Sequence, residues 1–212
     1  MISQLLVITI FLTIIFLHIS KKNFTAVLLY LIQSCAITIL LLQSSLEVGS
    51  LLLMFVAVLT FAVKSISTPW FFVRLIKKHQ LKFSASTYLS LPLALIVVAA
   101  LTTLTHSPLF APLSSISPSH QELLSLSLAA VLASFFLIIN RKGAISQMIG
   151  ILSMENSIVA FAIFSGLEQA PGLQIGVMFN IFIWIIIATV FASMIYKQFG
   201  SLDVTTMKQL KD

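Results

Sequence analysis

The chain has 212 residues, of which 59% are hydrophobic and only 8% are charged, and its formal net charge is +6. A soluble domain carries about 25% charged residues, so this composition excludes a soluble fold, and the high hydrophobicity excludes intrinsic disorder. The excess of Lys and Arg does not indicate nucleic-acid binding, because these residues form short clusters between apolar runs rather than one basic face. The composition predicts a membrane protein with several spans.

Apolar runs close to the length that crosses a bilayer, about 20 residues, predict an all-α membrane bundle with seven transmembrane helices. In chain order the expected spans are 2–19, 24–42, 49–63 or 49–72, 88–104, 123–139, 144–164 and 173–196. No run alternates with the period of an outer-membrane barrel strand, which favours helices. A cleaved signal peptide is not expected, because no positive region precedes the first apolar run and Lys21 and Lys22 follow it.

The basic residues test this number of spans independently. If seven spans alternate, eleven of the twelve basic residues fall on one side: Lys21, Lys22, Arg74, Lys77, Lys78, Lys82, Arg141, Lys142, Lys197, Lys208 and Lys211. The loops on the other side then carry no Lys or Arg. Because cytoplasmic loops carry the excess of these residues, we expect the N-terminus outside and the C-terminus inside the cell.

A loop rich in Pro and Ser separates the fourth and fifth expected spans and is too polar to be a helix in lipid. It divides the chain into two unequal halves without a convincing internal repeat. We expect a four-helix membrane half over 1–106, an outer loop over 107–121, a three-helix half over 122–197 and a cytoplasmic tail over 198–212.

Two ionisable side chains remain inside the expected spans once the loops are set aside, Lys64 and Glu155. A charge at membrane depth costs at least about 2.5–3.5 kcal/mol on insertion scales, and such residues usually face the bundle interior with a partner. Counting along the helices places the two at similar depth, within reach of each other. Burial favours a neutral carboxyl group and a nearby ammonium favours a charged one. The pair is therefore a candidate proton site.

Alternative interpretations remain open for this pair. The two residues could form a static ion pair that fixes helix register, or Lys64 could extend to the cytoplasmic interface. Pro69 cannot donate to the carbonyl of Ser65, which predicts a kink or a free carbonyl and favours a hydrated pocket near Lys64. Equally, Pro69 could simply end the lipid-embedded part of the span.

Weaker polar candidates accompany the pair, chiefly Asn156 beside Glu155 and Asn180 in the seventh span. Such residues more often form hydrogen bonds between helices than proton relays. The four histidines lack metal-ligand spacing, Cys35 stands alone, and no phosphate-binding loop or nucleophile motif occurs. We therefore expect no catalytic residue, no metal and no cofactor in this chain.

Several short motifs in order resemble the membrane subunit hydrogenase-4 component E over most of the chain. They are Tyr30-Leu-Ile-Gln33-Ser34, Val63-Lys64-Ser-Ile-Ser-Thr-Pro69, Leu91-Pro92-Leu, Gln147-Met-Ile-Gly-Ile-Leu-Ser-Met-Glu155-Asn156, Phe199-Gly-Ser-Leu-Asp203-Val and Gln209-Leu-Lys-Asp212. This family belongs to group 4 nickel–iron hydrogenases and complexes like formate hydrogenlyase. Its last three spans are similar to chain K of NADH:quinone oxidoreductase.

The resemblance implies a non-catalytic subunit in the cytoplasmic membrane of a bacterium or archaeon, where it contributes to the membrane arm and to proton translocation. Its implied partners are antiporter-like and quinone-chamber-like membrane chains and soluble redox subunits on the cytoplasmic side. Glu155 occupies the place of a chain K carboxylate in the proton path, and Lys64 matches the family's lysine. The second carboxylate of chain K is absent, with Asn180 nearest to its place. A structural anchor and a subunit of a cation/proton antiporter are the alternatives.

Overall fold

The computed structural model describes residues 2–81, 83, 86–114, 118–165, 186, 189–190 and 193–197. Its elements are α1 (Ile2–Ile19), α2 (Asn23–Val48), α3 (Leu51–Thr60), the π-helix η1 (Phe61–Ser67), α4 (Thr68–Lys78), α5 (Leu91–Thr105), the 3₁₀ turn η2 (Pro108–Phe110), α6 (Ala111–Ser114), the 3₁₀ turn η3 (Pro118–His120), α7 (Gln121–Asn140) and α8 (Ala144–Phe164). The part of the chain that is described contains no extended strand, so the all-α prediction is confirmed.

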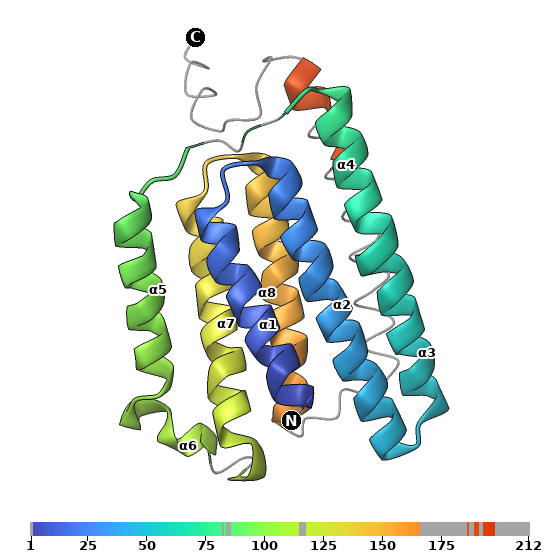
Figure 1. Ribbon diagram of the computed structural model, residues 1–212, viewed down its shortest axis with the longest axis vertical. Helices are drawn as coiled ribbons and strands as arrows, with labels where there is room; N and C mark the ends of the chain where they lie inside the picture. The colour runs from blue at the N-terminus through green and yellow to red at the C-terminus, as the bar shows by residue number, and fades with distance from the viewer. Residues whose placement is uncertain are drawn as a thin grey trace.

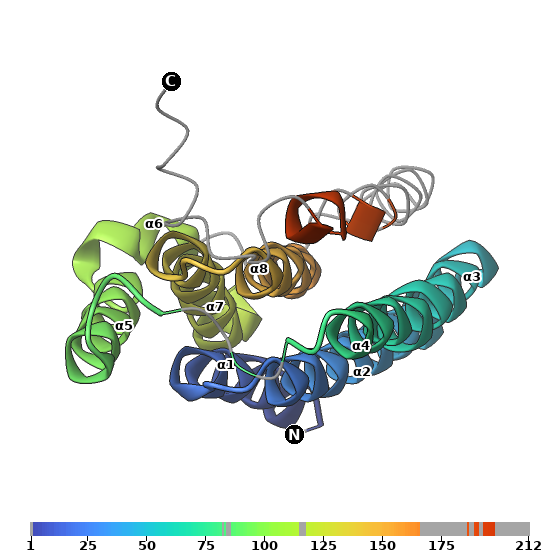
Figure 2. The same cartoon turned by 90° about the horizontal axis from the view of Figure 1, so that it is seen from above.

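Four helices form the centre of the bundle (Figure 1). Helices α1 and α2 pack side by side in one layer, and α7 and α8 pack behind them in a second layer, with α1 against α7 and α2 against α8 (Figure 2). The long α3–η1–α4 helix flanks α2, and α5 flanks α7 and α1 on the opposite side. Helices from both halves of the sequence therefore share one core.

Five of these helices are long and apolar enough to cross a membrane: 2–19, 23–48, 51–78, 121–140 and 144–164. Helix α5 is apolar but has only 15 residues. Large hydrophobic side chains cover the outside of the bundle, among them Phe16, Phe55, Ile66 and Ile96, each more than half exposed. An apolar exterior of this extent is stable in lipid rather than in water. The chain is a multi-pass helical membrane protein.

Two predicted helix boundaries are wrong. Helix α2 continues to Val48 instead of ending near residue 42, because Gln43 donates to Glu47 over 2.9 Å and accepts from Ser3 over 3.1 Å. These bonds satisfy the polar side chains of Gln43 and Glu47, which lie beyond the predicted end of the span. The helix ends at Gly49, whose φ of 69° is the left-handed conformation that glycine adopts without strain.

The third predicted span is also longer than expected and reaches Lys78 as one continuous helix. The other expected spans coincide with helices to within a few residues up to α8. The expected seventh span lies outside the described residues except for 186, 189–190 and 193–197, which are helical. The expected cytoplasmic tail, 198–212, lies outside them entirely.

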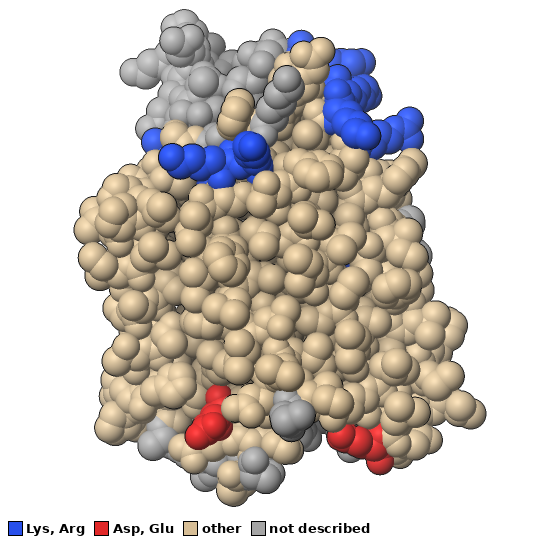
Figure 3. All heavy atoms as spheres, viewed as in Figure 1, with Lys and Arg blue, Asp and Glu red and all other residues tan. Residues whose placement is uncertain are grey.

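On the face that Figure 3 shows, charged side chains gather at the two ends of the bundle and leave a wide belt of uncharged surface between them. Lys and Arg lie at the end where α1 finishes and α2 begins, whereas the described acids on this face lie at the opposite end. We call these the basic end and the acidic end. The segregation agrees with the pattern that the loops of the sequence predicted.

Arg141 departs from the expectation of a solvated loop cation, because only 4% of it is exposed. Its Nη2 atom donates to the backbone carbonyls of Leu17, His18 and Ser20 at the end of α1. The last carbonyls of a helix lack intrahelical donors and carry partial negative charge. The guanidinium therefore links the end of α1 by hydrogen bonds to the connection between α7 and α8.

Candidate functional site in the membrane interior

A layer of polar side chains divides the interior of the bundle into two apolar clusters. Towards the basic end the cluster includes Val27 of α2 and Ile149 of α8, and towards the acidic end it includes Ile37 of α2 and Ala160 of α8. Between these clusters lie the buried polar side chains Gln33, Ser34, Lys64, Ser65, Ser153, Asn156 and Ser157. The polar layer sits near the middle of all three contributing helices, at the depth where polar groups cost most.

Lys64 and Glu155 meet in this layer. The Nζ atom of Lys64 lies 2.6 Å from Oε1 of Glu155 and donates to Oδ1 of Asn156 over 2.9 Å. Asn156 in turn donates from Nδ2 to Oγ of Ser34 over 3.3 Å. Lys64 is fully buried, whereas 17% of the Glu155 side chain is exposed. The result is a hydrogen-bonded chain that begins with the charged pair of Glu155 on α8 and Lys64 on η1, returns to α8 at Asn156 and ends at Ser34 on α2.

Lys64 is carried by a wide helical turn rather than by a regular α-helix. Over Phe61–Ser67 the backbone bonds span five residues, and the hydroxyls of Ser67 and Thr68 donate to the carbonyls of Ala62 and Val63 over 2.9 and 2.8 Å. The carbonyl of Val63 also accepts from the backbone N–H of Thr68, so its hydroxyl bond is an additional one. Pro69 follows directly and supplies no N–H to the turn that carries Lys64. A π-helical turn precedes Pro69 and the helix continues beyond it, while the kink or free carbonyl at Ser65 stays a prediction.

Several polar atoms in the layer lack a hydrogen-bond partner among the described residues. They are both amide atoms of Gln33, Oγ of Ser65 and of Ser153, and Oε2 of Glu155, whose other oxygen is held by Lys64. Such atoms are costly at membrane depth unless protein or water satisfies them. The layer therefore has unused donors and acceptors next to a carboxylate, which is what a chain of hydrogen-bonded water requires.

The structure brings together three of the four predicted site residues: Lys64, Glu155 and Asn156. Asn180 lies outside the described residues. The expectation that Lys64 could extend to the cytoplasmic interface is not what the structure shows, since its ammonium is directed inwards to Glu155. Among the described residues no group of His, Cys, Asp and Glu side chains has the arrangement of a metal site.

Two participants were missed as individual site residues. Ser34 ends the chain of hydrogen bonds that begins at Glu155, and the fully buried Tyr30, one turn earlier on α2, has a hydroxyl without a hydrogen-bond partner among the described residues. Together with Gln33 they occupy positions i, i+3 and i+4 of α2, which share one helix face. That polar stripe in an otherwise apolar helix was a usable signal for which side of α2 faces the other helices.

The fold and this layer together define a class: a multi-pass helical membrane protein with an internal charged pair. No protein-family model matches the chain, and no solved structure matches it. The chain is similar to the uncharacterized protein Rv0085 of Mycobacterium tuberculosis, with 22% identity over 158 residues, which covers 74% of this chain and 72% of the relative. The name of that relative states no activity, so function has to be argued from the site itself.

Proposed function

We propose that this chain is a non-catalytic membrane subunit of a redox complex like hydrogenase-4 and related to NADH:quinone oxidoreductase, and that it takes part in proton translocation. The observation that carries the proposal is the ion pair between Lys64 and Glu155 in the middle of the bundle. The resemblance to hydrogenase-4 component E supplies the type of complex. The pair supplies the chemistry, because a carboxylate in an apolar interior can exchange a proton when its counter-charge moves.

The proton step uses groups that are already in place. With the ammonium of Lys64 beside it, the carboxylate of Glu155 is favoured as the anion. If Lys64 moves away, the unpaired carboxylate is strongly disfavoured at this depth and takes up a proton on one oxygen. Return of the ammonium favours the anion again, and the proton then passes to hydrogen-bonded water in the polar layer, the same kind of group that supplied it. Asn156 accepts a hydrogen bond from Lys64 and so offers the ammonium a second partner during the exchange.

In the membrane, the proposed arrangement has seven spans with the N-terminus outside and the C-terminus in the cytoplasm of a bacterium or archaeon. The support is the gathering of Lys and Arg at one end of the bundle, since this excess marks the cytoplasmic side. Soluble redox subunits would then contact the basic end, and antiporter-like and quinone-chamber-like membrane chains would contact the apolar flanks.

The decisive experiment measures proton uptake and electron transfer separately in vesicles that contain the intact complex. Glu155→Gln keeps the shape of the side chain and removes the proton-binding group. We expect electron transfer to continue while coupled proton translocation falls strongly. Glu47→Gln is the matched control, because Glu47 lies at the acidic end of α2 and bonds only to Gln43 in the described structure. An assembled Glu155→Gln complex with unchanged translocation would refute the relay and favour a structural anchor.

A second experiment tests the type of complex. Purification of the native assembly through a tag on this chain should bring down a subunit that contains nickel–iron or iron–sulfur centres, detectable by metal analysis. An intact assembly without such metals would contradict the redox complex and favour the cation/proton antiporter. This outcome is separable from the first, because an antiporter subunit could still use Glu155 as a proton site.

A further inference from the structure

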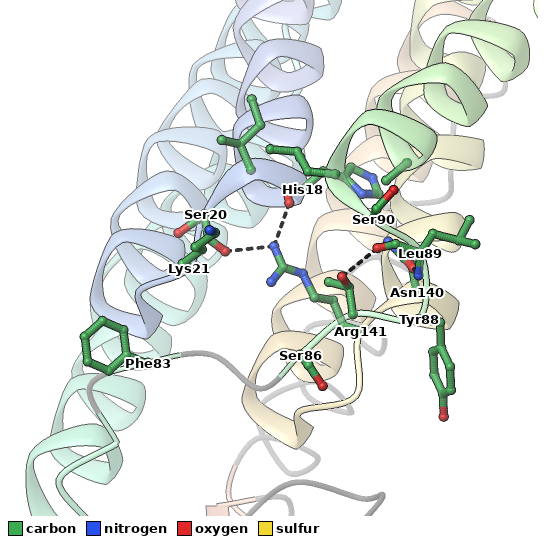
Figure 4. Close-up of a pocket in the computed structure, with 14 residues that line it drawn as sticks. His18, Ser20, Lys21, Phe83, Ser86, Tyr88, Leu89, Ser90, Asn140 and Arg141 are labelled. Carbon is green, nitrogen blue, oxygen red and sulfur yellow. Dashed lines mark hydrogen bonds between the residues drawn. The ribbon is translucent and has the colours of Figure 1, made fainter.

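A cavity of about 480 Å³ opens at the basic end, apart from the polar layer. Its wall comes from the end of α1, the segment 86–90 that leads into α5, and the junction of α7 and α8 (Figure 4). Its volume lies within the range of about 300–1,000 Å³ that is typical of ligand pockets. The proposed proton step uses none of its residues.

The charge that faces this cavity is positive. Lys21 and Arg141 line it, and Lys142 lies with Nζ 4.8 Å from the centre of the ring of Tyr88, another lining residue. The carbonyls of α1 hold Arg141 in position in the wall of the cavity. None of the described lining residues carries a carboxylate. The cavity is therefore suited to an anion.

His18 adds a polar atom of a different kind. It is 95% buried, and its Nε2 lies 3.1 Å from the carbonyl oxygen of Ala133, which can only accept a hydrogen bond. Nε2 therefore carries the proton, and in the neutral ring Nδ1 is an acceptor. That atom has no partner among the described residues. That nitrogen is itself buried, so His18 closes the inner wall of the cavity rather than facing a ligand.

An apolar pocket of about 400 Å³ continues from the cavity. It shares the lining residues Tyr88, Leu89 and Asn140 and extends along α7 over Phe136 and Ile139. Ile139 is more than half exposed on the outside of the bundle. A cationic pocket at the end of the spans that leads into an apolar groove matches an amphipathic ligand. A free anion would leave the apolar groove unused.

We propose that this cavity binds the headgroup of an anionic phospholipid of the phosphatidylglycerol kind. The phosphate lies near Lys21 and Lys142, and an acyl chain follows Phe136 and Ile139. Basic pockets between helices on the cytoplasmic side of a membrane are suited to such headgroups. The inference requires only that the bundle lies in a membrane and is independent of the redox complex.

The test uses the full chain in phosphatidylcholine nanodiscs with a minor fraction of phosphatidylglycerol, and native mass spectrometry measures the lipid that remains bound. We expect phosphatidylglycerol to be retained in preference to phosphatidylcholine. Lys21→Gln should weaken its binding roughly fivefold, the effect of one lysine near a charged headgroup. Lys77→Gln removes an exposed lysine at the same end that does not line the cavity, and should leave binding unchanged.

A steric variant keeps the proposal testable without a change of charge. Ser90 is exposed, lines the cavity and makes no capping bond at the start of α5, so Ser90→Phe should fold and fill the space. We expect it to abolish retention of phosphatidylglycerol, whereas Thr103→Phe at the other end of α5 should not. Equal retention of both lipids, or retention that neither cavity variant alters, would overturn the proposal. Displacement of the lipid by equimolar inorganic phosphate would also overturn it, since the site would then select a free anion.

Discussion

Lys64 and Glu155 are each expensive to bury and each reduces the cost of the other. A single charge at the middle of a span costs at least about 2.5–3.5 kcal/mol, and attraction at 2.6 Å together with the bond to Asn156 offsets much of this. A buried ion pair is nevertheless seldom more stabilising than a pair of apolar residues of the same size. Stability alone therefore does not explain why this chain places two charges there, which favours a role in proton exchange.

Removal of one member of the pair should destabilise the bundle much more than removal of both. Glu155→Gln leaves the ammonium of Lys64 buried beside a neutral amide, which should lower the free energy of unfolding by about 3–5 kcal/mol. The double variant Lys64→Met with Glu155→Gln should recover most of that loss. Thermal or denaturant unfolding in detergent measures both. A double variant less stable than either single variant would contradict this account of the pair.

His79 makes a polar contact and a ring contact at the basic end, just beyond α4. Its Nε2 lies 3.3 Å from Oγ of Ser193 and its ring packs on Tyr196, with ring centres 4.4 Å apart. Burial, and then the positive charges of Lys78 and Lys197, lower the pKa of His79 below its usual value of 6.5. At neutral pH the ring is therefore uncharged.

Because this pKa is lower in the folded chain, the unfolded chain binds the proton more tightly and acid favours unfolding. The stability associated with neutral His79 is complete above about pH 6.5 and is lost as the pH falls towards the folded pKa. The unfolding midpoint of the wild type should therefore fall, relative to that of His79→Gln, between pH 7 and pH 5. Parallel profiles for the two proteins would contradict the prediction. The other titrating groups are common to both proteins, so their contributions cancel in the difference between the two unfolding midpoints.

At the scale of the elements, a glycine allows α7 and α8 to approach each other closely. A Cβ atom added at Gly150 of α8 would lie 2.9 Å from Cγ1 and 3.4 Å from the backbone nitrogen of Ile138 on α7. Small residues allow this kind of approach between membrane helices, where dispersion contacts rather than the hydrophobic effect favour association. The α7–α8 hairpin that carries Glu155 therefore depends on the missing side chain.

Gly150→Ala should destabilise the bundle by about 1–3 kcal/mol through overpacking. Ile138→Ala removes the atom that the new methyl group would meet. In a double-mutant cycle the two changes together should cost less than the sum of the single changes, by about 1 kcal/mol or more. Unfolding in detergent provides the four free energies. Additive effects would show that the helices separate or tilt rather than collide at this point.

At the scale of the whole molecule, the two charged ends predict which residues reagents reach from each side of the membrane. In a Cys35→Ser background, single cysteines at Glu47 or Glu122 should react with an impermeant maleimide in intact cells. Single cysteines at Lys77 or Lys142 should react only after permeabilisation, because Lys and Arg mark the cytoplasmic side. The opposite pattern would reverse the proposed orientation, and labelling of all four in intact cells would contradict a spanning bundle.

The sequence predicted the helices and the charged pair for the same physical reason. Apolar length locates spans, and once the loops were set aside only Lys64 and Glu155 remained at depth. Prediction from the sequence failed for features that depend on the rotation of a helix about its axis or on contacts between residues far apart in the chain. The end of α2 was wrong because Ser3 and Glu47 satisfy Gln43. The bond from Glu47, four residues on, was a local signal that could have been used, whereas the contact with Ser3 and the burial of Arg141 depend on distant parts of the chain.

The hydrogen bonds from Arg141 to the end of α1 also indicate the order in which the helices assemble. The carbonyls of Leu17, His18 and Ser20 and the guanidinium that binds them are separated by more than 120 residues. During synthesis α1 and α2 enter the membrane long before Arg141 has been made. The carbonyls at the end of α1 must therefore first accept hydrogen bonds from water or lipid headgroups. The bundle is consequently completed late. When the α7–α8 hairpin packs against the earlier helices, it brings Glu155 to Lys64 and brings Arg141 to the terminal carbonyls of α1.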